Sequence, residues 1–216
     1  MNAIVHFNDT LPLPTVLDGP TASPHRRHLI DRFDLAPAAL ARFNAYLNSI
    51  DPDAQGLDAD RIATAARELN DRSTGTAAPR CITEQMRRAT ALVCMEADRD
   101  WRAANEAGET ARKVIAYVRG NDDLIPDGLP RVGRLDDAIV IRTAWPLLAD
   151  EVADYLDFCR IRRIEAQLRG LAPASFHMDR NDWESAGRAE MALVQHHRRV
   201  RECTYLPERA PLFRVH

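Results

Sequence analysis

The 216-residue chain has no surplus of positive charge: its formal net charge is −3 at pH 7 and its pI is near 6.2. Lysine is almost absent, because Lys113 is the only one and all other basic residues are arginines or histidines. Domains that bind nucleic acids usually carry a basic surplus. We therefore expect no nucleic-acid partner.

Cysteine motifs and long apolar runs are also missing. The four cysteines match no spacing that is typical of zinc or redox motifs. No stretch approaches the roughly 18 consecutive apolar residues that a membrane-spanning helix needs. The N-terminus shows no signal-peptide pattern. These absences predict a cytoplasmic protein without a transmembrane segment that folds without a disulfide or structural zinc.

What the chain does contain is apolar residues three and four positions apart, the pattern of amphipathic helices. We therefore predict an all-α fold, a bundle of about six helices with an extended, proline-rich N-terminal arm and an extended C-terminal tail. Asp34 and Pro37 suit the start of the first helix. Gly108 is expected to break the chain between the third and fourth helices, and Pro146 to kink or restart the fifth. The predicted helices are 36–49, 58–72, 83–105, 109–120, 135–169 and 183–203, the last capped by Asp182 or Asn181.

Composition also suggests how the chain is divided. Prolines are dense in residues 1–33, which prevents a helix and predicts an arm that packs along the body or reaches a partner. Small and polar residues at 73–79 indicate a linker. The predicted organisation is an arm (1–33), an N-terminal helical pair (34–78) and a main helical domain (79–216) that contains a helical hairpin (109–169).

The connection inside that hairpin has an unusual sequence. It reads Asp-Leu-Ile-Pro-Asp from Asp123 to Asp127, then Pro130, Gly133 and the pair Asp136-Asp137 at the start of a helix. In order and spacing this segment resembles the signature of the YkvA-like family, a small helical domain of bacteria. The resemblance covers residues 109–169 and implies a helical hairpin. It implies no established chemistry, although membrane association in that family suggests peripheral membrane contact.

Two interpretations of the segment remain open. In the first, its residues shape the backbone: prolines restrict the turn, Gly128 and Gly133 take unusual backbone angles, and the aspartates cap a helix. Apolar side chains then fill the gap between the helices. In the second, carboxylates converge on a divalent cation such as Mg²⁺ or Ca²⁺ and support phosphate-ester hydrolysis. The candidate metal ligands are Asp123, Asp127, Asp136 and Asp137, the last three also being the candidate catalytic residues.

A second, weaker metal candidate lies between the first two predicted helices. Asp51, Asp53 and Gln55 occupy positions 1, 3 and 5 of a loop that partly imitates an EF-hand, with Gly56 at position 6. Ile62 stands where the bidentate glutamate is required. The loop is therefore either a poor calcium site or a capped helix–turn–helix.

Two arginine clusters are candidate interaction surfaces. They lie near predicted helix C-termini, where cations complement the helix dipole. Each cluster is either a solvated helix face or a docking patch for an acidic partner. The clusters are Arg160, Arg162 and Arg163, and Arg198, Arg199 and Arg201.

No complete catalytic set accompanies any of these features. We therefore expect a non-catalytic interaction or regulatory protein of bacterial type, with a protein partner or self-association and no required cofactor. The metal-dependent hydrolase described above is the alternative, and a membrane-peripheral accessory protein is a second alternative.

Overall fold

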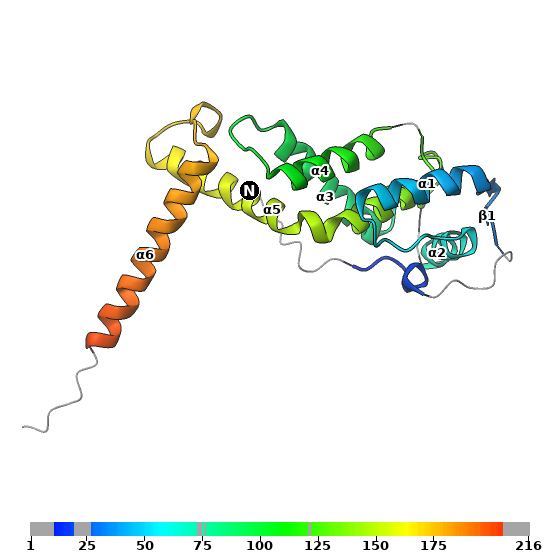
Figure 1. Ribbon diagram of the computed structural model, residues 1–216, viewed down its shortest axis with the longest axis horizontal. Coiled ribbons are helices and arrows are strands. Elements are labelled where there is room, and N and C mark those ends of the chain that lie inside the picture. Colours follow the sequence, from blue (N-terminus) through cyan, green and yellow to red (C-terminus); the bar gives the residue numbers. More distant parts are fainter. Residues whose placement is uncertain (1–10, 20–26, 73–74, 76, 121, 205–216) are drawn as a thin grey trace, which may run out of the picture. The chain divides into compact units, whose positions relative to one another are not determined.

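The computed structural model describes residues 11–19, 27–72, 75, 77–120 and 122–204, except the side chains of 174 and 201–204. Contacts divide the chain into two units, Met1–Tyr155 and Leu156–His216. This division falls inside a helix and does not coincide with the linker predicted near residue 78. The predicted all-α class is confirmed (Figure 1). The helices of the described residues are α1 (Pro37–Ile50), α2 (Ala59–Arg72), α3 (Arg80–Ala97), α4 (Asn105–Val118), α5 (Leu135–Leu168) and α6 (Arg180–Thr204).

The first part of α5 is the centre of the first unit. Every residue from Leu135 to Ile141 is buried, including two aspartates. A helix that is apolar on nearly all sides must be surrounded by other elements. Contacts of several kinds tie the neighbouring helices together: Tyr46 of α1 donates to the Lys113 carbonyl of α4 at 2.6 Å, and the Arg88 guanidinium of α3 lies 4.1 Å from the centre of the α5 Trp145 ring.

The starts of α1 and α2 follow their sequences closely. Pro37 opens α1, where its missing N–H costs nothing. The Asp58 carboxylate accepts from the Arg61 amide at 2.8 Å and caps α2. Both helices lie within one or two residues of the predicted bounds.

The boundary between α3 and α4 was predicted at the wrong place. Gly108 lies inside α4, because one glycine costs a helix only about 1 kcal/mol relative to alanine. α3 ends instead at Ala97, where the Asp98 side chain accepts from the Asp100 amide at 3.1 Å and so favours a turn over the helix. The buried Trp101 then anchors the connection by donating to Glu151 of α5 at 3.0 Å.

Of the kink or restart predicted at Pro146, the restart does not occur, since α5 continues through this exposed proline to Leu168. Buried residues on both sides of it, such as Ala144 and Leu148, stabilise the helix despite the missing N–H. The predicted end is confirmed. Gly170 has a φ of +68°, and the Leu171 amide donates to the Ala166 carbonyl at 2.8 Å, as in a Schellman cap.

α6 begins three residues earlier than predicted. Its cap is Asp179, because the Asp182 amide donates to the Asp179 carboxylate at 2.9 Å and the Asp179 amide donates back at 3.1 Å. This reciprocal pair is a capping box, so Asp182 is the third residue of the helix rather than its cap.

The described part of the N-terminal arm packs along the body of its unit. Leu13 and Leu17 are buried, the latter in a short 3-10 helix, η2 (Thr15–Asp18), that packs on α2. A two-residue hairpin follows, β1 (Leu29–Ile30) paired with β2 (Phe33–Asp34). The arm is therefore less extended than predicted, whereas the predicted C-terminal tail lies outside the described residues. Among the described residues, no helix is long and apolar enough to cross a membrane.

Candidate functional site

The segment Asp123–Asp137 joins α4 to α5, with a helix on each side as predicted. Asp136 is its organising residue and is only 1% exposed. Its Oδ2 atom accepts three hydrogen bonds, from the Leu124 amide at 2.8 Å, the Ile125 amide at 3.0 Å and the Tyr117 hydroxyl at 3.0 Å. One carboxylate oxygen therefore holds the start of the turn, the end of α4 and the first turn of α5 together.

Apolar side chains of the turn fill the space beneath it. Leu124, Ile125 and Leu135 are buried as predicted, and Val132 is buried with them. Leu129, predicted to join this set, is half-buried. Each such burial contributes roughly 1.5–3 kcal/mol relative to an exposed side chain.

The glycines of the turn work differently from the prediction. Neither Gly128 nor Gly133 has a positive φ; Arg131 does, at +67°. A Cβ atom at Gly133 would lie 2.5 Å from the Asp127 carbonyl oxygen. Gly133 is therefore required by the close approach of two backbone segments. Arg131 is held by the carbonyls of Asn70 and Gly75, at 3.2 Å and 2.5 Å.

Burial also changes the acidity of the aspartates. It raises the pKa of Asp136 to about 6, although the Ile125 amide and Tyr117 hydroxyl oppose the rise by stabilising the carboxylate. It raises the pKa of Asp137 to about 7, and the charge of Asp136 adds to the effect. Asp137 therefore exchanges its proton near neutral pH, the behaviour expected of a general acid or base.

Among the described residues, the Asp137 carboxyl group does not face a pocket in which a substrate could take up its proton. Asp137 is 2% exposed, and the pocket described below does not include it. Asp127, the third candidate catalytic residue, is an exposed residue that pairs with Arg134 at 3.2 Å. Burial also raises the pKa of Asp123, which is half-buried. The structure thus separates these carboxylates into buried and exposed groups.

No group of three or more His, Cys, Asp or Glu side chains that could hold a metal ion occurs in the described part of the chain. The loop with Asp51, Asp53 and Gln55 is built by turn contacts instead. The Asp53 amide donates to the Asp51 carboxylate at 3.0 Å, and Asn44 exchanges two hydrogen bonds with the Leu57 backbone. This geometry fits the capped helix–turn–helix interpretation.

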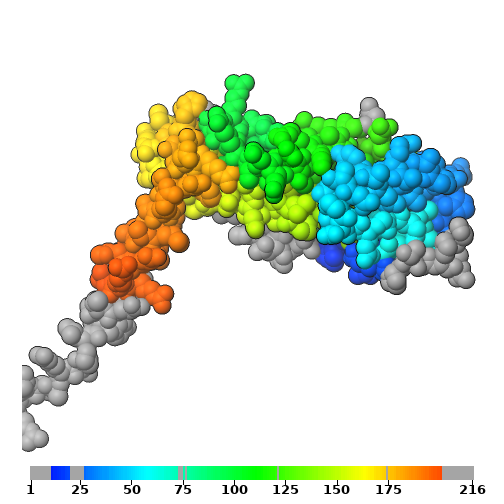
Figure 2. All heavy atoms as spheres, in the orientation of Figure 1, coloured from blue at the N-terminus to red at the C-terminus, as the bar shows by residue number. Residues whose placement is uncertain are grey.

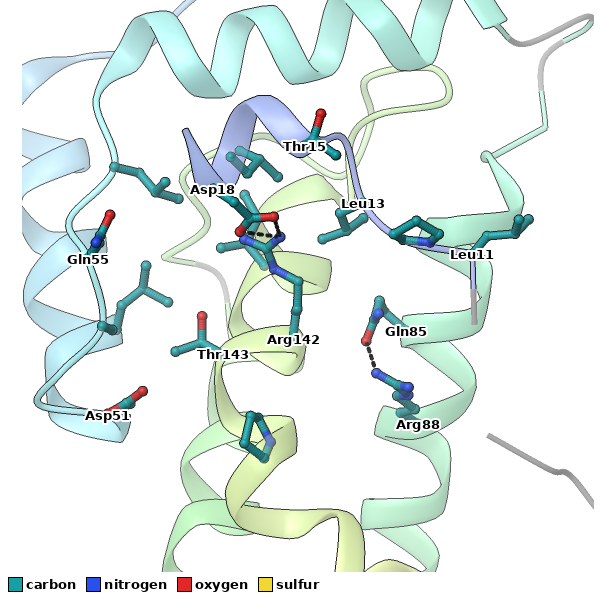
Figure 3. A pocket seen from close by; sticks show the side chains of 17 residues that line it. Leu11, Leu13, Thr15, Asp18, Asp51, Gln55, Gln85, Arg88, Arg142 and Thr143 are labelled. Atoms are coloured by element: carbon teal, nitrogen blue, oxygen red, sulfur yellow. Dashed lines mark hydrogen bonds and ion pairs between the residues drawn. The ribbon is translucent and has the colours of Figure 1, made fainter. Parts of the chain in front are cut away.

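A pocket of about 660 Å³ lies beneath residues 11–18, against α3 and α5 (Figure 3). Its charged lining residues are Arg88, Arg142, Asp18 and Asp51. Arg142 pairs with Asp18 at 3.0 Å, and Arg88 donates to Gln85 at 3.2 Å. Positive and negative side chains are thus equal in number, so the lining favours no charged class of ligand.

The two arginine clusters differ in their surroundings. Arg160 pairs with Asp157 at 2.8 Å, and the Arg162 guanidinium lies 4.6 Å from the centre of the Phe158 ring. Arg163 beside them is half-buried, whereas Arg198 and Arg199 on α6 are exposed. The side chain of Arg201 lies outside the described residues. The first cluster is therefore largely engaged within its own helix.

Sequence reasoning missed the exposed apolar side chains on α6, the helix drawn in orange in Figure 2. Every residue from Arg188 to Val200 is exposed. Large apolar side chains among them are 47–66% exposed, which is uncommon for several neighbours on one helix. They are Met191, Leu193, Val194 and Val200. Leu193 and Val200, seven residues apart, share one side of the helix, whereas Met191 and Val194, three residues apart, lie on another side.

The start of α6 is fixed within its own unit. The Trp183 indole N–H donates to Asp157 in the second half of α5 at 2.9 Å, and the capping box holds the first turn. The helix is therefore anchored at one end and exposed from Arg188 to Val200. No family model, curated protein or solved structure matches this chain.

Proposed function

We propose that this chain is a non-catalytic interaction protein and that it binds another polypeptide through α6. The observation that carries the proposal is the exposed side of this helix that contains Leu193 and Val200. Exposed apolar patches on a helix are typical of protein-binding surfaces. The acidic turn has a structural role in this proposal, because its buried carboxylate binds backbone amides.

The exposure of α6 also has an energetic consequence. A helix gains most of its stability from the packing of its apolar face, and short helices without such packing are marginal in water. Residues 188–200 make up about half of α6 and are exposed on all sides. Covering Leu193 and Val200 would remove apolar area from water and stabilise the helix at the same time.

The membrane-peripheral alternative draws on the same helix, since apolar and basic side chains together also suit a lipid surface. Asp182, Glu184 and Glu190 oppose it, because they would meet the negative charge of anionic lipids. The hydrolase alternative centred on Asp127, Asp136 and Asp137 has no three-ligand group behind it among the described residues. The YkvA-like resemblance remains a proposal about the fold of residues 109–169 and supports neither alternative.

Site-specific photo-crosslinking in the native cells tests the proposed function. A benzophenone amino acid replaces Leu193, and in a matched control it replaces Gln195, which is exposed on the opposite face of the same helix. We expect a covalent adduct with a polypeptide from position 193 and much less from position 195. Equal labelling at both positions, or no protein adduct from either, would overturn the proposal. Flotation with anionic liposomes that depends on Leu193 would favour the membrane alternative.

A further inference from the structure

Charge is distributed unevenly along α6. Its first half with the cap, residues 179–190, contains four carboxylates and two arginines. Its second half, residues 193–204, contains three arginines, one glutamate and two histidines. Because the first half has four carboxylates and only two arginines, its surplus charge is negative. Both of these arginines lie 3.7 Å from Glu184. One end of the helix is therefore complementary in charge to the other.

We infer that the polypeptide bound by α6 is a second copy of this chain and that the two α6 helices pair antiparallel. The inference rests on the proposed function and names its partner. In an antiparallel pair the acidic half of each helix lies against the basic half of the other, whereas a parallel pair places like charges together. The arrangement is isologous, so it closes as a dimer.

The midpoint of α6 predicts the register of this pair. Ala192 is the central residue of Arg180–Thr204. Full overlap of two antiparallel helices puts the two-fold axis at this residue. Leu193 of each copy then lies about 3 Å along the helix axis from Leu193 of the other copy, and Val200 lies on the same side of the helix.

The expected strength of this interaction is modest. The exposed segment 188–200 spans roughly four helical turns, and two such segments bury less area than the roughly 1,200–2,000 Å² of most stable interfaces. The capping box and the hydrogen bond from Trp183 to Asp157 already hold the first turn of α6, so the helix can begin to fold before a second copy binds. The dimer is therefore expected to dissociate reversibly in the micromolar range, about 1–100 μM.

Sedimentation velocity of the full chain across this concentration range tests the inference first. We expect a concentration-dependent shift from monomer to dimer. Leu193→Glu puts two carboxylates at the axis and should weaken association at least tenfold. Gln195→Glu, the same new side chain two residues away on the opposite face, should leave it unchanged. A monomer at all concentrations, or equal effects of both substitutions, overturns the inference.

Disulfide trapping measures the geometry directly, in a chain whose Cys94 and Cys203 are serine. Leu193→Cys lies near the two-fold axis and should form a disulfide-linked dimer under mild oxidation. Ala186→Cys should not, because its symmetry mate lies about 18 Å away along the axis. Linking at both positions indicates a parallel pair and overturns the inference.

Sedimentation and crosslinking together distinguish a failure of the dimer inference from a failure of the proposed function. If the chain is monomeric in sedimentation but position 193 crosslinks to a different polypeptide in cells, the proposed function holds and the second copy is excluded as its partner. If position 193 gives no protein adduct, both are overturned.

Discussion

The turn from Asp123 to Asp137 and the second half of α6 are both rich in charged residues, but they use them in opposite ways. In the turn, a carboxylate is buried and accepts three hydrogen bonds from its own chain. In α6 between Arg188 and Val200, charged and apolar side chains alike are exposed. A buried carboxylate that binds its own backbone shapes the fold, whereas apolar side chains exposed to water are suited to a partner.

The largest expected effect is on the turn. Asp136→Ala leaves two buried amides and a buried hydroxyl without their acceptor, which should cost about 3–5 kcal/mol of unfolding free energy. Asp136→Asn retains an acceptor oxygen and should cost less. Urea denaturation measures both, with the exposed Asp122→Ala as the control. If Asp136→Ala behaves like Asp122→Ala, the carboxylate does not organise the turn.

The second prediction concerns the close backbone approach at Gly133. Gly133→Ala would place a methyl group 2.5 Å from the Asp127 carbonyl oxygen, so the turn must shift, at a cost of about 2–4 kcal/mol. A Cβ atom at Gly128 would have no neighbour within 4 Å, which makes Gly128→Ala the matched control. Thermal unfolding should separate the two variants clearly. Equal melting temperatures would show that the turn is not tightly packed at Gly133.

The third prediction concerns how the stability of the folded chain depends on pH. The folded-state pKa of Asp137, about 7, lies above the unfolded value near 4, so the folded chain holds this proton more tightly. Its contribution to stability is therefore complete below about pH 4 and is lost as the pH rises toward 7 and above. Asp137→Asn removes this loss and should be more stable than the native chain by about 1–3 kcal/mol at pH 8.

Denaturation of the native chain and Asp137→Asn at pH 5 and pH 8 measures the difference between them. The advantage of the variant should grow with pH. An advantage that is the same at both pH values, or is larger at pH 5, would contradict the assigned environment of Asp137.

The smallest expected effect is on the folding of the other region. Leu193→Ser removes an exposed side chain and should change the unfolding free energy of the monomer by less than about 0.5 kcal/mol. Denaturation at protein concentrations well below the dissociation constant of the proposed dimer measures this change in unfolding free energy. A loss of several kcal/mol would mean that α6 is part of the folded core, and the contrast with the turn would disappear.

The sequence predicted the features of the turn that depend on local chemistry. The helices on either side, the acidic start of α5 and the Gly170 cap follow from spacing and residue type. The three donors of Asp136 could not be assigned, because a carboxylate near a helix start usually caps that same helix. Here it reaches back twelve residues to the Leu124 amide.

The exposure of α6 could not be predicted for a different reason. An amphipathic pattern indicates an apolar face but does not say whether that face is covered by the same chain. From charge alone, Arg198 and Arg199 were predicted to form an interaction surface. The exposed segment of α6 also contains the apolar residues Met191 and Leu193. The end of α3 was missed because the turn at Asp98 depends on Trp101 reaching Glu151, fifty residues away.

Amide hydrogen exchange of the full chain at low and high protein concentration compares the two regions directly. We predict that the amides of Leu124 and Ile125, which donate to Asp136, are protected equally at both concentrations. The amides of residues 188–200 should exchange quickly in dilute solution and become protected as concentration rises. Protection of α6 that does not change with concentration, or rapid exchange at Leu124 and Ile125, would contradict the division between a structural turn and an interacting helix.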